Sequence, residues 1–161
     1  MVKLQEVLIL LARNEVDFVI VGGVAATLHG SAYATFDLDL VYSREPPNVA
    51  RLANALAPCH PQLREAPAEL PFVWDAATLR NGLNFTLTTD LGDLDLLGEL
   101  AGIGAFAEVK ARSAPVDLFG RPFAVLSLDG LIAAKRAAGR PKDLLTLPEL
   151  EALREAQTSR E

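Results

Sequence analysis

The sequence predicts an α/β (α+β) protein, with a mixed β-sheet of about four to six strands and helices packed against it. Short runs of β-branched or alternating residues, typical of strands, are interspersed with segments of helical periodicity. We find no internal repeat and no low-complexity tract. The chain has 161 residues, and we expect one domain over 1–161, with 128–161 as a C-terminal helical segment.

The first part of the chain is expected to alternate helices and strands. Apolar residues at helical spacing predict a helix over 3–14, and the β-branched run 17–21 predicts a buried strand. The alanine-rich segment 24–28 indicates a short helix that opens at a glycine pair. Strict alternation over 36–41 is typical of a strand with two unlike faces, and a helix over 48–57 is expected to follow.

The rest of the chain is predicted to begin with a loop and to end in helices. Four prolines in 58–71 favour a loop. Turn sequences between alternating runs predict two hairpins, with strands at 84–88, 93–97, 115–118 and 122–126. Helices are expected at 128–138 and 147–156.

Composition indicates a soluble protein of a reducing compartment. Apolar residues make up 50% of the chain and charged residues 22%, which is ordinary for a globular protein. No apolar run approaches the ~18 residues of a membrane span. The N-terminus lacks the pattern of a secretion signal, and the single Cys59 cannot build a disulfide framework. We therefore expect a cytoplasmic protein with no membrane partner.

Charge is distributed unevenly. The net charge of −6 argues against a protein that coats nucleic acid without sequence preference, because such binding needs a cationic face. Residues 109–142 nevertheless carry seven bases and two acids, whereas residues 1–108 carry six bases and fourteen acids. This arrangement suits a metal-bound polyphosphate, whose metal needs acids and whose phosphates need bases. A chance surface patch explains the charges equally well.

Asp37 and Asp39 are candidate metal ligands. They lie two residues apart on a predicted strand, so both side chains leave the same face. Two carboxylates so close repel one another unless a cation or a basic partner lies between them. Oxygen ligands of this kind suit Mg²⁺. The alternative is a solvent-facing strand, on which alternating aspartates have no special role.

Gly22 and Gly23 stand at a predicted junction of strand and helix. Without Cβ atoms, the backbone there can approach phosphate oxygens, and the helix N-terminus beyond it offers free N–H groups. A glycine pair at a tight turn is more often only conformational. The residues that follow, including Thr35, Asp37 and Asp39, strengthen the phosphate interpretation.

These residues resemble a known signature. The segments Val21-Gly22-Gly23-Val24-Ala25-Ala26, His29-Gly30 and Thr35-x-Asp37-Leu38-Asp39 are similar to minimal nucleotidyltransferases of the polymerase-β superfamily, closest to the abortive-infection and toxin–antitoxin type toxins. Gly92-Asp93-Leu94-Asp95 resembles the later strand with the third carboxylate, and 128–145 resembles the C-terminal region of small members. Tyr33 departs from the pattern, since relatives commonly have Arg there.

The resemblance implies a polymerase-β-like fold and transfer of a nucleoside monophosphate from a nucleoside triphosphate to an acceptor hydroxyl. It implies two Mg²⁺ ions, or Mn²⁺, held by Asp37, Asp39 and Asp95. Asp93 shares a face with Asp95 and is the alternative third ligand. The residues expected to bind the nucleotide are Gly22, Gly23, Thr35, Lys135 and Lys142.

Several points stay open. The acceptor is a tRNA, a protein or a small molecule, and a toxin would have an antitoxin partner. Tyr33 favours the alternative of an inactive nucleotide- or partner-binding module with the same fold. His29 is expected to cap a helix or make a polar contact rather than act in catalysis. Phe72, Trp74 and Phe85 are expected in the core, and Cys59 with His60 supports neither zinc binding nor thiol catalysis.

Overall fold

The protein is described here by a computed structural model covering residues 1–33, 35–67 and 69–159. A seven-stranded mixed sheet has the strand order β3-β4-β5-β2-β1-β9-β8, and a two-stranded sheet is formed by β6 and β7. The strands are β1 (Phe18–Val21), β2 (Leu38–Tyr42), β3 (Gln62–Leu63), β4 (Phe85–Thr89), β5 (Gly92–Leu97), β6 (Glu99–Leu100), β7 (Gly104–Ala105), β8 (Ser113–Leu118) and β9 (Arg121–Leu126).

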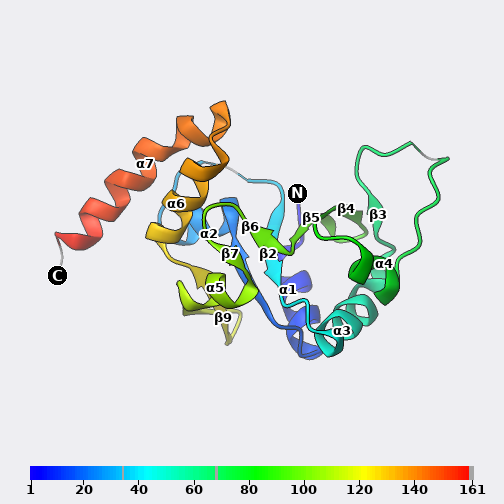
Figure 1. Cartoon of the computed structure of the whole chain (residues 1–161). Coiled ribbons are helices and arrows are strands. Elements are labelled where there is room, and N and C mark those ends of the chain that lie inside the picture. Colours follow the sequence, from blue (N-terminus) through cyan, green and yellow to red (C-terminus); the bar gives the residue numbers. More distant parts are fainter. Residues whose placement is uncertain (34, 68, 160–161) are drawn as a thin grey trace.

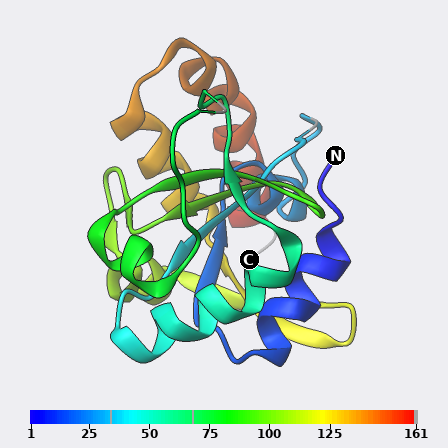
Figure 2. The same ribbon diagram turned by 90° about the vertical axis from the view of Figure 1, so that its right-hand side faces the viewer.

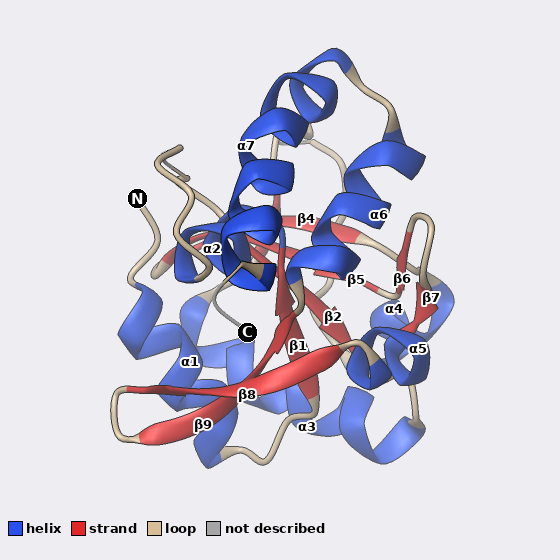
Figure 3. Ribbon diagram, turned by 90° about the vertical axis from the view of Figure 1, so that its left-hand side faces the viewer, coloured by secondary structure: helices blue, strands red, loops and turns tan. Residues whose placement is uncertain are grey.

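Helices pack around the large sheet (Figure 1). They are α1 (Leu4–Arg13), α2 (Gly22–Leu28), α3 (Pro46–Leu56), α4 (Ala76–Asn81), α5 (Phe106–Ala111), α6 (Leu128–Ala138) and α7 (Pro141–Thr158), with a 3₁₀ turn at Ala57–Cys59. Helices α1 and α3 contact one another below the sheet (Figure 2). Helices α6 and α7 pack together at the other end of the molecule (Figure 3). Across the described residues, no helix combines the length and apolar composition that a bilayer crossing needs.

The two central strands β2 and β5 have one buried and one open face. Leu38 and Leu40 are buried, as are Leu94 and Leu96, while the aspartates between them remain partly exposed. Each leucine buried in this way contributes about 1.5–3 kcal/mol relative to an exposed position, so the core fixes the register of both strands. The register in turn fixes which acids meet on the open face.

The predicted fold class is confirmed, with two corrections to the sheet. It has seven strands rather than about four to six. The β8–β9 hairpin joins the same sheet, because β9 pairs in parallel with β1 at Ile20 and Val125. The stretch 58–71 is not wholly a loop, since β3 pairs with β4 inside it.

Other element boundaries also differ from expectation. Strand β2 begins at Leu38, so Asp37 lies just before the strand rather than within it. Helix α7 begins at Pro141, because proline is well tolerated in the first turn and the Asp143 carboxylate accepts from the Arg140 backbone N–H at 3.2 Å. The short elements α4, α5, β6 and β7 were not predicted, since each is too brief to show a periodicity.

Candidate active site

The parallel pairing of β2 with β5 brings two of the predicted ligands together. Asp39 is the register partner of Asp95, just as Leu38 is the partner of Leu94. Both carboxyls leave the face opposite the buried leucines and meet across the two strands. Asp93 lies one pleat away on the same face, where the Thr88 hydroxyl donates to its Oδ1 at 3.2 Å. The register therefore places Asp95, and not Asp93, directly beside Asp39.

The carboxyl of Asp39 is electrostatically stressed. Burial, together with the adjacent Asp95 carboxyl and the nearby Asp37, raises its pKa from 3.8 to about 7, while Lys135 opposes the shift. At about pH 7, Asp39 is therefore only partly ionised in the metal-free protein. A divalent cation bound beside Asp39 would favour the ionised form of its carboxyl, so that Asp39 would release its proton.

This shift predicts a pH dependence of the metal-free protein. Because the pKa of Asp39 is raised from 3.8 to about 7 in the folded state, ionising it becomes an increasing cost as pH rises from about 4 to about 7 and a constant cost above that range. Asp39→Asn removes the cost. In chelator, we expect the variant to melt at least about 3 °C above wild type at about pH 8. At about pH 5 the difference should shrink, and a constant difference would contradict the shift.

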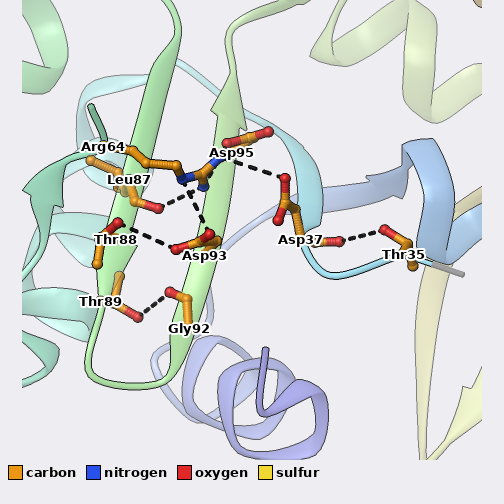
Figure 4. Close-up of polar contacts among 9 residues, drawn as sticks. All are labelled: Thr35, Asp37, Arg64, Leu87, Thr88, Thr89, Gly92, Asp93 and Asp95. Carbon is orange, nitrogen blue, oxygen red and sulfur yellow. Dashed lines mark hydrogen bonds and ion pairs between the residues drawn. The ribbon is translucent and has the colours of Figure 1, made fainter. Parts of the chain in front are cut away.

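Arg64 lies among the carboxylates, although no pattern in the sequence indicates a role for it. It follows β3, and its backbone N–H donates to the Thr86 carbonyl at 2.9 Å. Its guanidinium nitrogens lie 3.5 Å from Asp37 Oδ2, 3.4 Å from Asp93 Oδ2 and 3.0 Å from Asp95 Oδ1 (Figure 4). We call Asp37, Asp39, Asp93 and Asp95 the acidic group. Arg64 forms ion pairs with three of its members but, among the described residues, none with Asp39.

The carboxylate oxygens of the site are suitable ligands for a hard divalent cation, but the Arg64 guanidinium lies among them. Within the described part of the chain, no three acidic, His or Cys side chains are already gathered as a metal site. Arg64 Nη2 donates instead to the Leu87 carbonyl at 2.7 Å, and the buried Asp95 Oδ1, although close to Arg64, accepts no hydrogen bond. A carboxylate oxygen that forms an ion pair at 3.0 Å but accepts no hydrogen bond is suited to bind a metal cation in place of the guanidinium. Asp39 and Asp95 are the residues best placed to bind such a cation, because they are register partners on neighbouring strands.

The glycine pair lies directly against this site. Gly22 has a φ of +65°, and a Cβ atom there would overlap the carboxylate of Asp39. A Cβ on Gly23 would come within 2.7 Å of Thr35 Oγ1, whose hydroxyl donates to the Asp37 carbonyl at 3.2 Å. The backbone at the start of α2 thus lies directly against Asp39 at Gly22 and against Thr35 at Gly23, with no side chain between them.

Gly22→Ala should therefore disturb the site and not only the backbone. Both Gly22 and Gly120 have positive φ values, +65° and +80°, but a Cβ on Gly120 meets no atom within 4 Å. Each alanine should destabilise the fold by about 1 kcal/mol through backbone strain. Only Gly22→Ala should also weaken metal-dependent triphosphate binding, by about tenfold or more, as measured by calorimetry. Equal binding in the two variants would reduce the glycine pair to a turn.

Two basic side chains at the junction of α6 and α7 lie near enough to Asp39 to interact with its charge. Lys135 Nζ lies 3.4 Å from Asp143 Oδ1, and Arg140 Nε lies 2.6 Å from Asp143 Oδ2. The Asp143 side chain is only 2% exposed, and its hydrogen bonds to Arg140 are the main reason that the pKa of Arg140 is raised, with Asp39 adding to the effect. A nearly buried carboxylate thus holds two cations toward the site.

The remaining predicted residues are placed less centrally. Lys142 is exposed, and its side chain makes no hydrogen bond or ion pair among the described residues. His29 ends α2 and its Nε2 contacts the Leu126 carbonyl at 2.8 Å, which confirms the expected polar contact. Phe85 is buried in the core, and Phe72 and Trp74 pack partly buried against it. Tyr33 is 49% exposed.

Three solved structures are similar to the chain over nearly its whole length. One, from Thermotoga maritima, is provisionally assigned as a nucleotidyltransferase and has a TM-score of 0.54 and 15% identity, covering 99% of this chain and 96% of its own. Two are structures of the antibiotic-resistance factor ANT(2'')-Ia, with TM-scores of 0.56 and 0.55 and 18% identity. They cover 98% of this chain and 90% and 95% of their own.

The fold is that of the nucleotidyltransferases. No protein-family model and no curated protein matches the sequence. At these identities the likeness establishes the architecture, which agrees with the expected fold class. The resemblance to toxin–antitoxin toxins in particular stays a prediction.

Proposed function

We propose that the protein is a nucleotidyltransferase that transfers a nucleoside monophosphate from a nucleoside triphosphate to an acceptor hydroxyl, releasing pyrophosphate. The observation that carries the proposal is the in-register pair Asp39 and Asp95, which lies on the open face of a nucleotidyltransferase fold. Function has to be argued from the site rather than from the fold, and this pair has the chemistry of a metal-assisted phosphoryl centre.

The acidic residues would hold Mg²⁺, with Asp39 and Asp95 as ligands and Asp37 nearby as a third. Bound Mg²⁺ would supply charge neutralisation at the phosphate oxygens and activation of the attacking hydroxyl. The carboxyl of Asp95, partly exposed beside Asp39, is in a position to accept the proton of the acceptor hydroxyl.

The basic residues would hold the phosphates that the acids repel. Lys135 and Arg140 face the acidic group from α6 and α7, and Asp143 fixes their positions. The glycine turn at Gly22 and Gly23 lies beside Asp39, and Thr35 lies beside Asp37. The triphosphate would therefore lie between this turn and the basic side chains of Lys135 and Arg140. Lys142, being exposed, is proposed only as a peripheral contact.

The acceptor is proposed by class. ANT(2'')-Ia has been seen in complex with adenylyl-2''-tobramycin, which makes a small polyhydroxylated molecule one candidate. The resemblance to toxins adds tRNA and protein hydroxyls, and with them an antitoxin partner.

Labelling with a cell extract tests the proposal. The protein is incubated with Mg²⁺, an extract, and each ribonucleoside triphosphate labelled at the α-phosphate. We expect one triphosphate to label one class of acceptor, and pretreatment of the extract with ribonuclease or protease to show which class it is. Tight triphosphate binding without label in any fraction would favour the inactive binding module instead.

A further inference from the structure

Arg64 lies within the acidic group, and it is less exposed than other ion-paired arginines of the chain. Its side chain is 17% exposed, compared with 38% for Arg51 and 59% for Arg140 in their ion pairs. It reaches Asp37, Asp93 and Asp95 at once. The Leu87 carbonyl on β4 accepts from its Nη2 at 2.7 Å, which holds the guanidinium plane in place (Figure 4).

The position of this guanidinium is incompatible with some forms of metal binding. Asp37 and Asp95 both point at Arg64, so a cation that bridged these two carboxylates would lie against a fixed positive charge. An arginine and a divalent ion a few ångströms apart repel one another even when solvent screens the charges strongly. A free metal ion would therefore bind weakly while Arg64 stays in place.

A triphosphate changes this balance, because it brings negative charge into the same space. A triphosphate with the one divalent metal that accompanies it adds a net negative charge, which Arg64 attracts rather than repels. The residue also stands where the two-residue strand β3 gives way to the segment 64–75, so its side chain can turn without disturbing a long strand. Figure 1 shows residues 64–67 leaving the sheet beside β3 and β4.

We propose that Arg64 is a specificity-determining residue, which makes the site accept the metal–triphosphate complex and reject the free metal. It acts as a resident cation that keeps Asp37, Asp93 and Asp95 together until the complex arrives, and then pairs with the incoming phosphates. The inference rests on the proposed function, since it assumes that these carboxylates are a metal site.

Titration with Mn²⁺ alone tests the inference. Binding of Mn²⁺ without nucleotide is followed by electron paramagnetic resonance in wild type, Arg64→Gln and Arg64→Lys. Arg121→Gln is the matched control, because Arg121 is an exposed residue of β9, far from β3 in the strand order of the sheet, and its loss changes the net charge equally. We expect Arg64→Gln to bind Mn²⁺ at least about tenfold more tightly than wild type, and Arg64→Lys and Arg121→Gln to stay within about threefold of it.

The outcomes separate this inference from the proposed function. Unchanged Mn²⁺ affinity in Arg64→Gln, combined with metal-dependent triphosphate binding in wild type, would overturn the role of Arg64 and leave the metal site standing. No Mn²⁺ binding in any variant, with triphosphate affinity indifferent to metal, would overturn both. If Arg64→Gln does not fold, the test uses wild type alone, whose affinity for Mn²⁺ is measured with and without a non-hydrolysable triphosphate. Tight binding of Mn²⁺ that is equal in the two conditions contradicts the inference.

Discussion

Asp39→Asn is expected to abolish the metal dependence of triphosphate binding and to reduce nucleotidyl transfer by about 10³-fold or more. Burial and the neighbouring carboxyls of Asp95 and Asp37 raise the pKa of Asp39 to about 7, so a cation that stabilises its ionised form relieves a large cost. Asparagine keeps the shape but cannot neutralise a divalent ion. Calorimetry with a non-hydrolysable triphosphate, in Mg²⁺ and in chelator, measures the first effect.

The control for this substitution is Asp117→Asn. Asp117 is an exposed strand aspartate in β8, so its replacement changes the net charge equally without touching the site. Wild type and the control should lose about tenfold or more in affinity when Mg²⁺ is removed, whereas Asp39→Asn should lose none. Equal affinity of wild type with and without chelator would show that the acids do not form a metal site.

The second large effect is expected for Asp95→Asn, which should leave triphosphate affinity within about threefold of wild type while lowering transfer by about 10³-fold. Asp37 and Asp39 remain to hold the metal that accompanies the triphosphate, so ground-state binding survives. In the proposed mechanism Asp95 would act on the acceptor side of the site, where interactions matter mainly in the transition state, so their loss would lower turnover rather than binding.

Asp93→Asn is the paired control, because Asp93 lies on the same face and also pairs with Arg64. Binding and turnover are measured side by side in the two variants. Loss of turnover in Asp95→Asn alone supports the register argument. Loss in Asp93→Asn alone would mean that the wrong carboxylate was chosen, and equal loss in both would indicate a general electrostatic effect.

Much of the site followed from alternation in two short segments. Leu38 and Leu40 had to be buried, which placed Asp39 on the open face, and the same pattern in β5 placed Asp95 there. Sequence alone could not show that the two strands are neighbours in parallel, because that pairing depends on the crossover between them. The choice between Asp93 and Asp95 depended on the resemblance until the register was known.

Arg64 shows the limit of such reasoning. It lies in a proline-rich stretch without periodicity, next to a strand of two residues, so no local pattern marks it as part of the site. The excess of bases in 109–142 was more informative, since Lys135 and Arg140 lie near enough to Asp39 to interact with its charge. Lys142, from the same stretch, is exposed, because the side chain that α7 turns inward at this point belongs to Asp143.

Position-specific labelling tests the central claim most directly. The protein, Mg²⁺ and the acceptor fraction are incubated with one triphosphate labelled either at the α-phosphate or at the γ-phosphate, and both acceptor and released phosphates are analysed. A nucleotidyltransferase transfers the α-label to the acceptor and releases the γ-label as pyrophosphate, and Asp39→Asn should do neither. Transfer of the γ-label to the acceptor, or label transfer unaffected by Asp39→Asn, would contradict the account.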